Sequence, residues 1–200
     1  MTFTLNFLVS FLIVFIANFN SADEWLLKKD SNGIKVYIKN DESAKIKEFK
    51  AITIIETNIE NVNKLIGETE KASKWMSNVT ETKVIKKVSN NEQYVYSVID
   101  MPWPVDDRDI IINSKTIRSG GNIKIEMNGV PNYAPKKEGF IRMPISNGSW
   151  TLIKESDNKT KVIYQFLADP GGNIPAWVIN MFLVDGPYET LINMKKMLKN

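Results

Sequence analysis

The sequence DPGGNIPAWVINMFLVDGPYETLINMKKMLKN, residues 169–200, marks a change from extended to helical structure. Its Pro-Gly-Gly run ends a strand, Asn173 is a suitable helix cap, and Pro175 fits a first helical turn, where its missing N–H has no partner to lose. Apolar residues then recur at helical spacing, and Gly186-Pro187 interrupts them, which predicts a kink. We therefore expect one long amphipathic helix from Ile174 to Asn200. Its apolar positions are Trp177, Val178, Met181, Phe182, Val184, Leu191, Ile192, Met194, Met197 and Leu198.

Before this helix, the chain carries a series of strand-like segments rich in β-branched and aromatic residues. Short turns of Ser, Asn, Asp and Gly separate them, and connections of this length join neighbouring strands as hairpins. The pattern therefore predicts an antiparallel meander. Its expected strands span residues 82–88, 93–100, 108–117, 123–127, 139–143, 148–154 and 161–167.

The segments before the meander mix helix and strand signals. Residues 23–29 are expected to form a short amphipathic helix, residues 34–39 alternate like a half-buried strand, and residues 45–57 form a second strand. Asn58 is expected to cap a helix, and a further short helix is expected at 70–76. Together these elements predict one α+β domain in which helices pack on one face of a curved antiparallel sheet.

Residues 7–17, FLVSFLIVFIA, are a dense apolar run that ends shortly before Ser21-Ala22. This pattern predicts a secretory signal peptide over residues 1–22, and therefore an exported mature domain at 23–200, periplasmic or secreted. No Lys or Arg precedes the run, unlike in most signal peptides. The alternatives are a short transmembrane anchor or a buried helix, although the run is shorter than the ~20 apolar residues of an uninterrupted span.

The absence of two residue types excludes many site chemistries. The chain has no His and no Cys, which removes the Ser-His-Asp triad, thiol nucleophiles, disulfides and the commonest zinc ligands. Its net charge of +3 is too small to indicate nucleic-acid binding, and it has no Gly-rich phosphate loop. We expect no metal and no cofactor. Mild attraction to an anionic membrane surface is compatible with this charge.

Residues 101–109, MPWPVDDRD, and residues 169–180, DPGGNIPAWVIN, lie at the start of an expected strand and of the final helix. The first resembles the W-P-hydrophobic-x-x-R-D segment of START domains, the StAR-related lipid-transfer modules. The second resembles the opening of that family's C-terminal helix, and Trp75 also fits. The resemblance extends from about residue 23 to the C-terminus.

The resemblance implies a helix-grip fold, in which a curved antiparallel β-sheet wraps around a long C-terminal α-helix and encloses an internal hydrophobic cavity. Such domains carry one lipid or sterol. The resemblance also implies that the loop before the final helix opens with the helix to admit ligand. Residues 170–172 are then either a hinge or a simple strand-to-helix turn.

Arg108 is the first candidate for contact with a ligand. It begins a strand that is otherwise apolar, and in START domains the matching arginine often points into the cavity. A guanidinium there would hold a phosphate, carboxylate or hydroxyl by a charge-assisted bond. The alternative is a structural ion pair with a neighbouring acid, and the two roles can coexist. The neighbouring acids are Asp100, Asp106, Asp107 and Asp109.

Large apolar side chains supply the remaining candidates. Trp103 and Trp150 either line the cavity or belong to an ordinary core. Tyr94 and Tyr96 share one face of a strand by period two, as do Tyr164 and Phe166, but the period does not decide which face is inward. On the final helix, Trp177, Met181 and Val184 follow helical spacing, with Tyr188 one turn on. The candidate ligand-binding residues are Arg108, Trp103, Tyr94, Tyr96, Met127, Phe140, Trp150, Tyr164, Phe166, Trp177 and Met181.

Three functions fit these observations. The preferred one is non-catalytic binding, and transport, of a lipid, sterol or other hydrophobic ligand by a monomer that contacts membranes transiently. The second is an enzyme on the same scaffold, aromatase/cyclase-like or a lipid hydrolase, although no paired-carboxylate or nucleophile motif singles out its residues. The third is a partner-binding module with a solid core. The residues available to an enzyme are Asp100, Glu126, Arg142 and Tyr164.

Overall fold

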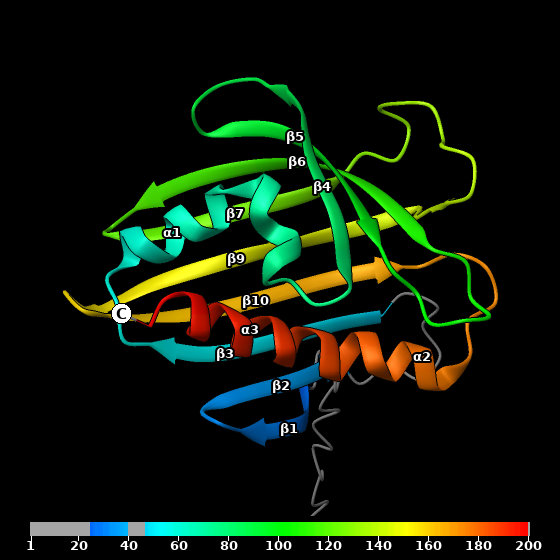
Figure 1. Ribbon diagram of the computed structural model, residues 1–200. Helices are drawn as coiled ribbons and strands as arrows, with labels where there is room; N and C mark the ends of the chain where they lie inside the picture. The colour runs from blue at the N-terminus through cyan, green and yellow to red at the C-terminus, as the bar shows by residue number, and fades with distance from the viewer. Residues whose placement is uncertain (1–24, 40–46, 200) are drawn as a thin grey trace, which may run out of the picture.

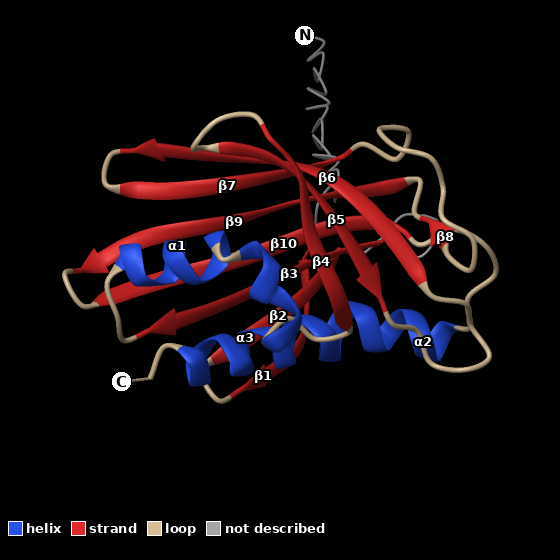
Figure 2. Ribbon diagram, turned by 45° about the horizontal axis from the view of Figure 1, so that its top comes forward, coloured by secondary structure: helices blue, strands red, loops and turns tan. Residues whose placement is uncertain are grey.

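The computed structural model describes residues 25–39 and 47–199, which form a sheet with helices over one of its faces (Figure 1). Figure 2 shows these helices from a second direction, on the same side of the strands. The expected fold class is confirmed. The elements are β1 (Trp25–Ser31), β2 (Ile34–Lys39), β3 (Lys47–Ile55), α1 (Ile59–Gly67), the 3-10 helix η1 (Thr69–Lys74), β4 (Val79–Lys87), β5 (Glu92–Ile99), β6 (Arg108–Ser119), β7 (Asn122–Gly129), β8 (Ile141–Arg142), β9 (Ile145–Ser156), β10 (Lys159–Asp169), α2 (Ala176–Asn180), the π-helical turn η2 (Met181–Asp185) and α3 (Gly186–Met197).

Among the described residues, ten strands form one sheet in the order β1-β2-β3-β10-β9-β7-β6-β5-β4, with β8 beside β6. The expected meander from β4 to β10 is confirmed with one correction. The segment at 139–143 contributes only Ile141–Arg142, and this short strand pairs parallel to β6 while β7 pairs directly with β9. At the other end of the sheet, β3 lies beside β10, so the first strands of the domain adjoin its last one.

The helix expected at residues 23–29 is wrong. Its described part belongs to β1, which pairs antiparallel with β2. The reason is the turn between them: Asn32 and Gly33 both have positive φ, 52° and 69°, as the tightest hairpin turns require. The ring of Trp25 is then covered by the ammonium of Lys50, 4.1 Å from its centre. A local hairpin has overridden the helical spacing.

The core lies between the concave sheet and the helices. Asn58 caps α1 as expected, since its side-chain oxygen accepts a hydrogen bond from the backbone N–H of Asn61 at 2.9 Å. The short helix expected at 70–76 is confirmed as the 3-10 helix η1, which delivers Trp75 into the core at 2% exposure. Val36, Val62, Leu152, Val162, Leu191 and Met194 pack in the same core with no exposed surface.

The C-terminal helix is present, with a different start and a π-helical turn inside it. Asn173 does not cap it; Pro175 is the residue at the cap, and the side chain of Asp169 instead bonds the backbone N–H of Gly171 at 2.8 Å. At η2, the Gly186 N–H bonds the Met181 carbonyl, five residues back, so the interruption expected at Gly186-Pro187 takes the form of a wider turn.

The β1–β2 hairpin holds the C-terminal helix through polar contacts. Lys29 forms an ion pair with Asp185 at 2.8 Å, and its ammonium lies 4.1 Å from the centre of the Tyr188 ring. Asn32 donates to the Tyr188 hydroxyl at 2.6 Å and accepts from Lys195 at 3.0 Å. We call these five residues the clasp. It fastens α3 to one edge of the sheet.

Within residues 25–39 and 47–199, no helix is long and apolar enough to cross a bilayer. The predicted signal peptide, residues 1–22, lies outside the described residues and stays a prediction.

Candidate functional site

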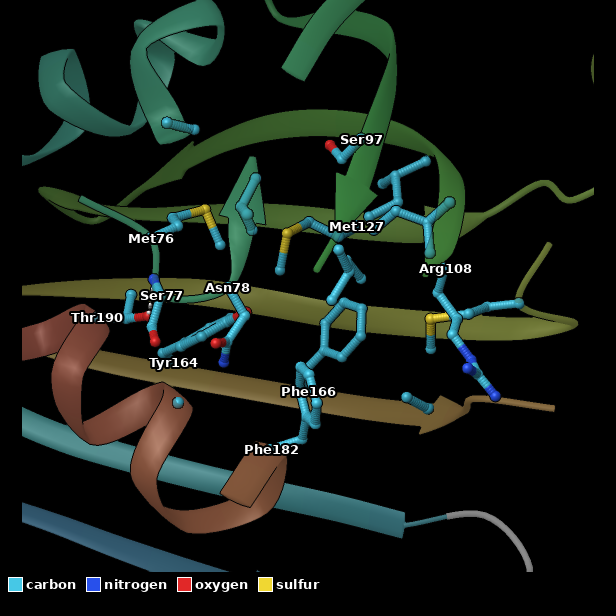
Figure 3. Close-up of a pocket in the computed structure, with 18 of the residues that line it drawn as sticks. Met76, Ser77, Asn78, Ser97, Arg108, Met127, Tyr164, Phe166, Phe182 and Thr190 are labelled. Atoms are coloured by element: carbon cyan, nitrogen blue, oxygen red, sulfur yellow. Dashed lines mark hydrogen bonds between the residues drawn. The ribbon is translucent and has the colours of Figure 1, made fainter. Parts of the chain in front are cut away.

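An internal cavity of about 240 Å³ lies between the sheet and the C-terminal helix (Figure 3). Its walls come from both halves of the sheet, from the segment after η1 and from the helix. Most lining side chains are aliphatic, aromatic or Met, as in sites that hold apolar molecules. They include Phe49, Ile66, Met76, Val95, Ile99, Met101, Ile110, Ile112, Ile125, Met143, Ile174, Ile179, Phe182 and Leu183.

Five of the predicted site residues line this cavity: Arg108, Met127, Trp150, Tyr164 and Phe166. The pairing of β9 with β10 sets Trp150 opposite Tyr164, and their rings stack at 3.9 Å with planes 4° apart. Phe166 lies opposite Gly148 in the same pairing. That these residues contact a ligand stays a prediction.

Gly148 gives the Phe166 ring its place in the cavity wall. A Cβ added at residue 148 would lie 2.5 Å from a ring carbon of Phe166 and 2.5 Å from the carbonyl oxygen of Gln165. No larger residue fits there unless both the Phe166 ring and the Gln165 backbone move.

The prediction that Tyr94 and Tyr96 line the cavity is wrong. They share one face of β5, as expected, but Val95 and Ser97 occupy the cavity side. Tyr94 stacks on Tyr133 at 4.1 Å on the outer face, and Tyr96 packs there in a second, smaller cluster.

Four further candidates also lie outside the lining. Phe140 packs against the outer cluster of Tyr96. Trp103 is 90% exposed and Trp177 is 55% exposed. Met181 is half-buried, and its neighbour Phe182 reaches the cavity instead. The helix residues that do line the cavity keep a regular helical spacing, so the error lies in which of two stripes faces inward. The stripe that lines the cavity comprises Ile179, Phe182, Leu183, Gly186 and Thr190.

Arg108 is buried, at 2% exposure, at one end of the cavity. Its guanidinium donates to the carbonyls of Asp106, Pro170 (3.2 Å) and Gly171 (3.0 Å), and so joins the β5–β6 loop to the loop before α2. Other N–H groups of the guanidinium have no described partner.

The alternative ion pair of Arg108 is wrong for the described residues, since none of the described carboxylates pairs with it. Asp109 instead pairs with Arg142, and Asp107 accepts from the Met101 backbone N–H. Burial lowers the pKa of Arg108, and the charges of Asp106 and Asp107 only partly oppose this. The end of the cavity therefore holds a buried cation that pairs with no carboxylate of the described residues, a setting that favours an anionic ligand.

Sequence reasoning missed the polar groups of the lining. Ser97, Asn78, Thr190 and Trp75 all belong to the cavity wall, and the indole N–H of Trp75 has no acceptor among the described residues. Ser97 lies between Val95 and Ile99 on the same face of the strand by period two. The sequence would predict it as a polar lining residue only if that face were known to be the inner one. Asn78 and Thr190 come from segments 112 residues apart, and no local pattern joins them.

The chain matches the START domain family over residues 17–200. PA1579, a protein of Pseudomonas aeruginosa, is 34% identical over 175 residues, which cover 87% of this chain and 86% of that one. The phosphatidylcholine transfer protein of Rattus norvegicus is 26% identical over 186 residues, covering 88% and 85%. Among solved structures, the STAR-related lipid transfer protein (fragment 25–204) from Xanthomonas axonopodis superposes with a TM-score of 0.80 at 34% identity, covering 89% of this chain and 100% of that one.

Proposed function

Because this chain belongs to the START domain family, whose members bind lipids, we propose that it is a non-catalytic carrier of one lipid, sterol or other hydrophobic ligand. The ligand lies in the cavity between the sheet and the C-terminal helix. The names of related proteins support lipid transfer as the purpose of this binding.

The observation that carries the proposal is the buried, carboxylate-free guanidinium of Arg108 at the end of an apolar cavity. A phosphate or carboxylate head of a ligand would supply the missing counter-charge, and its apolar part would cover the remaining wall. A charge-assisted bond of this kind contributes ~1.5–3 kcal/mol.

The surroundings of the acid and base candidates support a carrier over an enzyme. Glu126 pairs with Lys124 at 2.9 Å at the surface, and Arg142 is committed to Asp109. Tyr164 lines the cavity, but burial raises its pKa, which keeps the phenol neutral and a poor base. No described carboxylate pair lines the cavity for general acid–base work.

Two exposed Trp side chains support transient contact with a membrane. Trp103 belongs to the β5–β6 loop, and Trp177 belongs to the first turn of α2. Arg108 joins the β5–β6 loop to the loop that precedes α2. Indole rings at such positions prefer the interface between headgroups and acyl chains. We propose that this end of the molecule faces the membrane while ligand passes.

Export is part of the same proposal. The apolar run at residues 7–17 supports a signal peptide, and a mature monomer beginning at Asp23 would meet its ligand in the periplasm or outside the cell. The N-terminal sequence of the protein recovered from its host tests this; retention of residues 1–22 contradicts it.

Native mass spectrometry of the full chain purified without detergent tests ligand binding. We expect an apolar molecule in the spectrum, and retention of an anionic lipid roughly tenfold or more weaker in Arg108→Met. Arg118→Met is the matched control, because that guanidinium pairs with Glu60 at the surface.

Arg108 also supports two loops, so Arg108→Lys is measured alongside. We expect it to keep part of the retention, since the charge remains. Equal retention in Arg108→Met and wild type would contradict the headgroup contact. A protein that neither holds an apolar molecule nor takes one from vesicles would contradict the carrier function.

A further inference from the structure

Trp75, in the wall of the apolar cavity, carries an unpartnered polar group. The side chain lines the cavity at 2% exposure, and its indole N–H has no hydrogen-bond acceptor in the described chain. A buried N–H without an acceptor is unfavourable, and native proteins rarely leave one unmet. A group outside the described residues is therefore expected to accept this bond once the atoms that cover the N–H move aside.

The Tyr164 hydroxyl belongs to the same part of the cavity. Both side chains pack against the Trp150 ring, whose centre lies 5.8 Å from that of Trp75 and 3.9 Å from that of Tyr164. None of the described hydrogen bonds involves the Tyr164 hydroxyl, which burial keeps protonated by raising its pKa. It can therefore both donate and accept.

A third polar side chain completes this group. Asn78 lines the cavity next to Gly186, and its amide makes no hydrogen bond with the described residues. In Figure 3, Tyr164 and Asn78 lie at one end of the cavity and Arg108 lies at the other, with Phe166 and Met127 between them. We call Trp75, Tyr164 and Asn78 the distal group.

The separation of the two ends follows from β10. Arg108 is bonded to the carbonyl of Pro170, six residues after Tyr164, and an extended chain rises ~3.3 Å per residue, so the two ends lie about 20 Å apart. Between them, Phe166 and Ala168 face an apolar stretch of cavity. A ligand that satisfies both ends has two polar termini and an apolar middle.

The cavity volume restricts the ligand further. About 240 Å³ is below the ~300–1,000 Å³ of most small-molecule pockets, and the cavity reaches from Tyr164 to Pro170, two residues about 20 Å apart along an extended backbone. This shape suits one slender molecule better than a lipid with two acyl chains.

We infer that the ligand is a single-chain amphiphile with an anionic group at Arg108 and a hydroxyl or carbonyl group at its far end, bonded by the distal group. The inference rests on the proposed function, since it specifies the ligand of that same cavity. It assigns the distal group the task of selecting such molecules over simple fatty acids.

Calorimetric titration of the delipidated full chain with two matched acids tests this. The probes are hexadecanoic acid and ω-hydroxyhexadecanoic acid, which share a chain and a carboxylate. We expect the hydroxy acid to bind about tenfold more tightly, because its hydroxyl meets the unpartnered donor and acceptor groups.

Two variants locate the selectivity. Tyr164→Phe removes one hydroxyl, and benzothienylalanine in place of Trp75 removes one N–H while keeping the bicyclic ring. Each should reduce the preference for the hydroxy acid severalfold. Tyr94→Phe removes a hydroxyl on the outer face and should leave the preference unchanged; circular dichroism checks that all variants fold.

The outcomes separate the two proposals. Equal binding of both acids by wild type would overturn this inference and leave the carrier function standing. A preference that survives both substitutions would overturn the assignment to the distal group. Binding of neither acid would overturn the inference and also count against the carrier function.

Discussion

Arg142 donates to both carboxylate oxygens of Asp109, at 2.8 and 2.9 Å, with 2% and 1% of the two side chains exposed. The same guanidinium donates to the carbonyls of Pro131 and Ala134, and so ties the segment between β7 and β8 to the outer face of β6. Asp109 directly follows Arg108 in β6, and the side chains of consecutive strand residues point to opposite faces. The Arg108 guanidinium therefore lies on the cavity face of the sheet, and the Asp109 carboxylate lies on the outer face.

Removing one partner of this pair should be costly. Arg142→Met leaves a buried carboxylate without its cation, and we expect the free energy of unfolding to fall by ~3–5 kcal/mol. Urea denaturation measures it. The double variant Asp109→Leu/Arg142→Met should recover most of the loss, since both charges are gone. A single variant within about 1 kcal/mol of wild type contradicts the importance of the pair.

Gly148→Ala should disturb the cavity wall. The added methyl group collides with the Phe166 ring and the Gln165 carbonyl, so we expect a loss of ~1–3 kcal/mol in stability and weaker ligand retention. Gly67→Ala is the matched control: no atom lies within 4 Å of a Cβ there, and the helical position favours Ala. Equal stability of the two variants would show that Phe166 moves aside easily.

Trp103→Ala and Trp177→Ala should each weaken binding to anionic vesicles, and the double variant should weaken it further. The physical reason is the loss of an indole ring from the membrane interface. Co-sedimentation with vesicles at constant salt measures the effect. Val88→Ser, at an exposed apolar residue of the β4–β5 turn, is the control. Loss of binding in the control alone would place the membrane contact elsewhere.

The protein should lose stability in alkali through two tyrosines. Burial, aided by the charge of Asp109, raises the pKa of Tyr96 to about 12, and burial also raises that of Tyr164. The unfolded phenols ionise near pH ~10, so above that pH unfolding releases protons that the folded state retains. The stabilisation is fully present below pH ~10 and is lost as the pH rises through about 12.

Urea midpoints measured at about pH 9 and about pH 11.5 check this. The variant Tyr96→Phe/Tyr164→Phe should lose less stability over that interval than wild type. Tyr133→Phe, whose ring is 41% exposed, should behave as wild type. An identical loss in all three proteins would assign the alkaline effect to other groups.

Local patterns predicted most of the fold, and they failed where distant contacts decide the outcome. Period two placed Tyr94 with Tyr96 and Tyr164 with Phe166 correctly, because alternation is a property of any strand. Which of the two pairs faces the cavity depends on how β5 and β10 are placed in the sheet. The alternation of residues along a strand gives no information about that placement. The stripe of Trp177 and Met181 is wrong for the same reason, since helical spacing does not say which of two apolar stripes faces the cavity.

The polar parts of the site were the least predictable. The resemblance points to Arg108 as a site residue. Its carbonyl partners Pro170 and Gly171 cannot be predicted from local patterns, because the first of them follows 62 residues later in the sequence. The sequence singles out Trp75 only as a residue that fits the family resemblance. That its N–H lacks a partner is a property of the packed cavity and has no counterpart in the sequence.

The pairing of β3 with β10 and the clasp between Lys29, Asn32 and the final helix have a consequence for biosynthesis. Until β10 is made, β3 has an unpaired edge, and such edges invite aggregation. The clasp forms even later, because it also needs Asp185 and Tyr188 to have been synthesised. The nascent chain therefore cannot close its cavity before Tyr188 has been synthesised, and these long-range pairings are slow to form. Late closure suits a chain that is threaded unfolded through a translocation pore, as the proposed export requires.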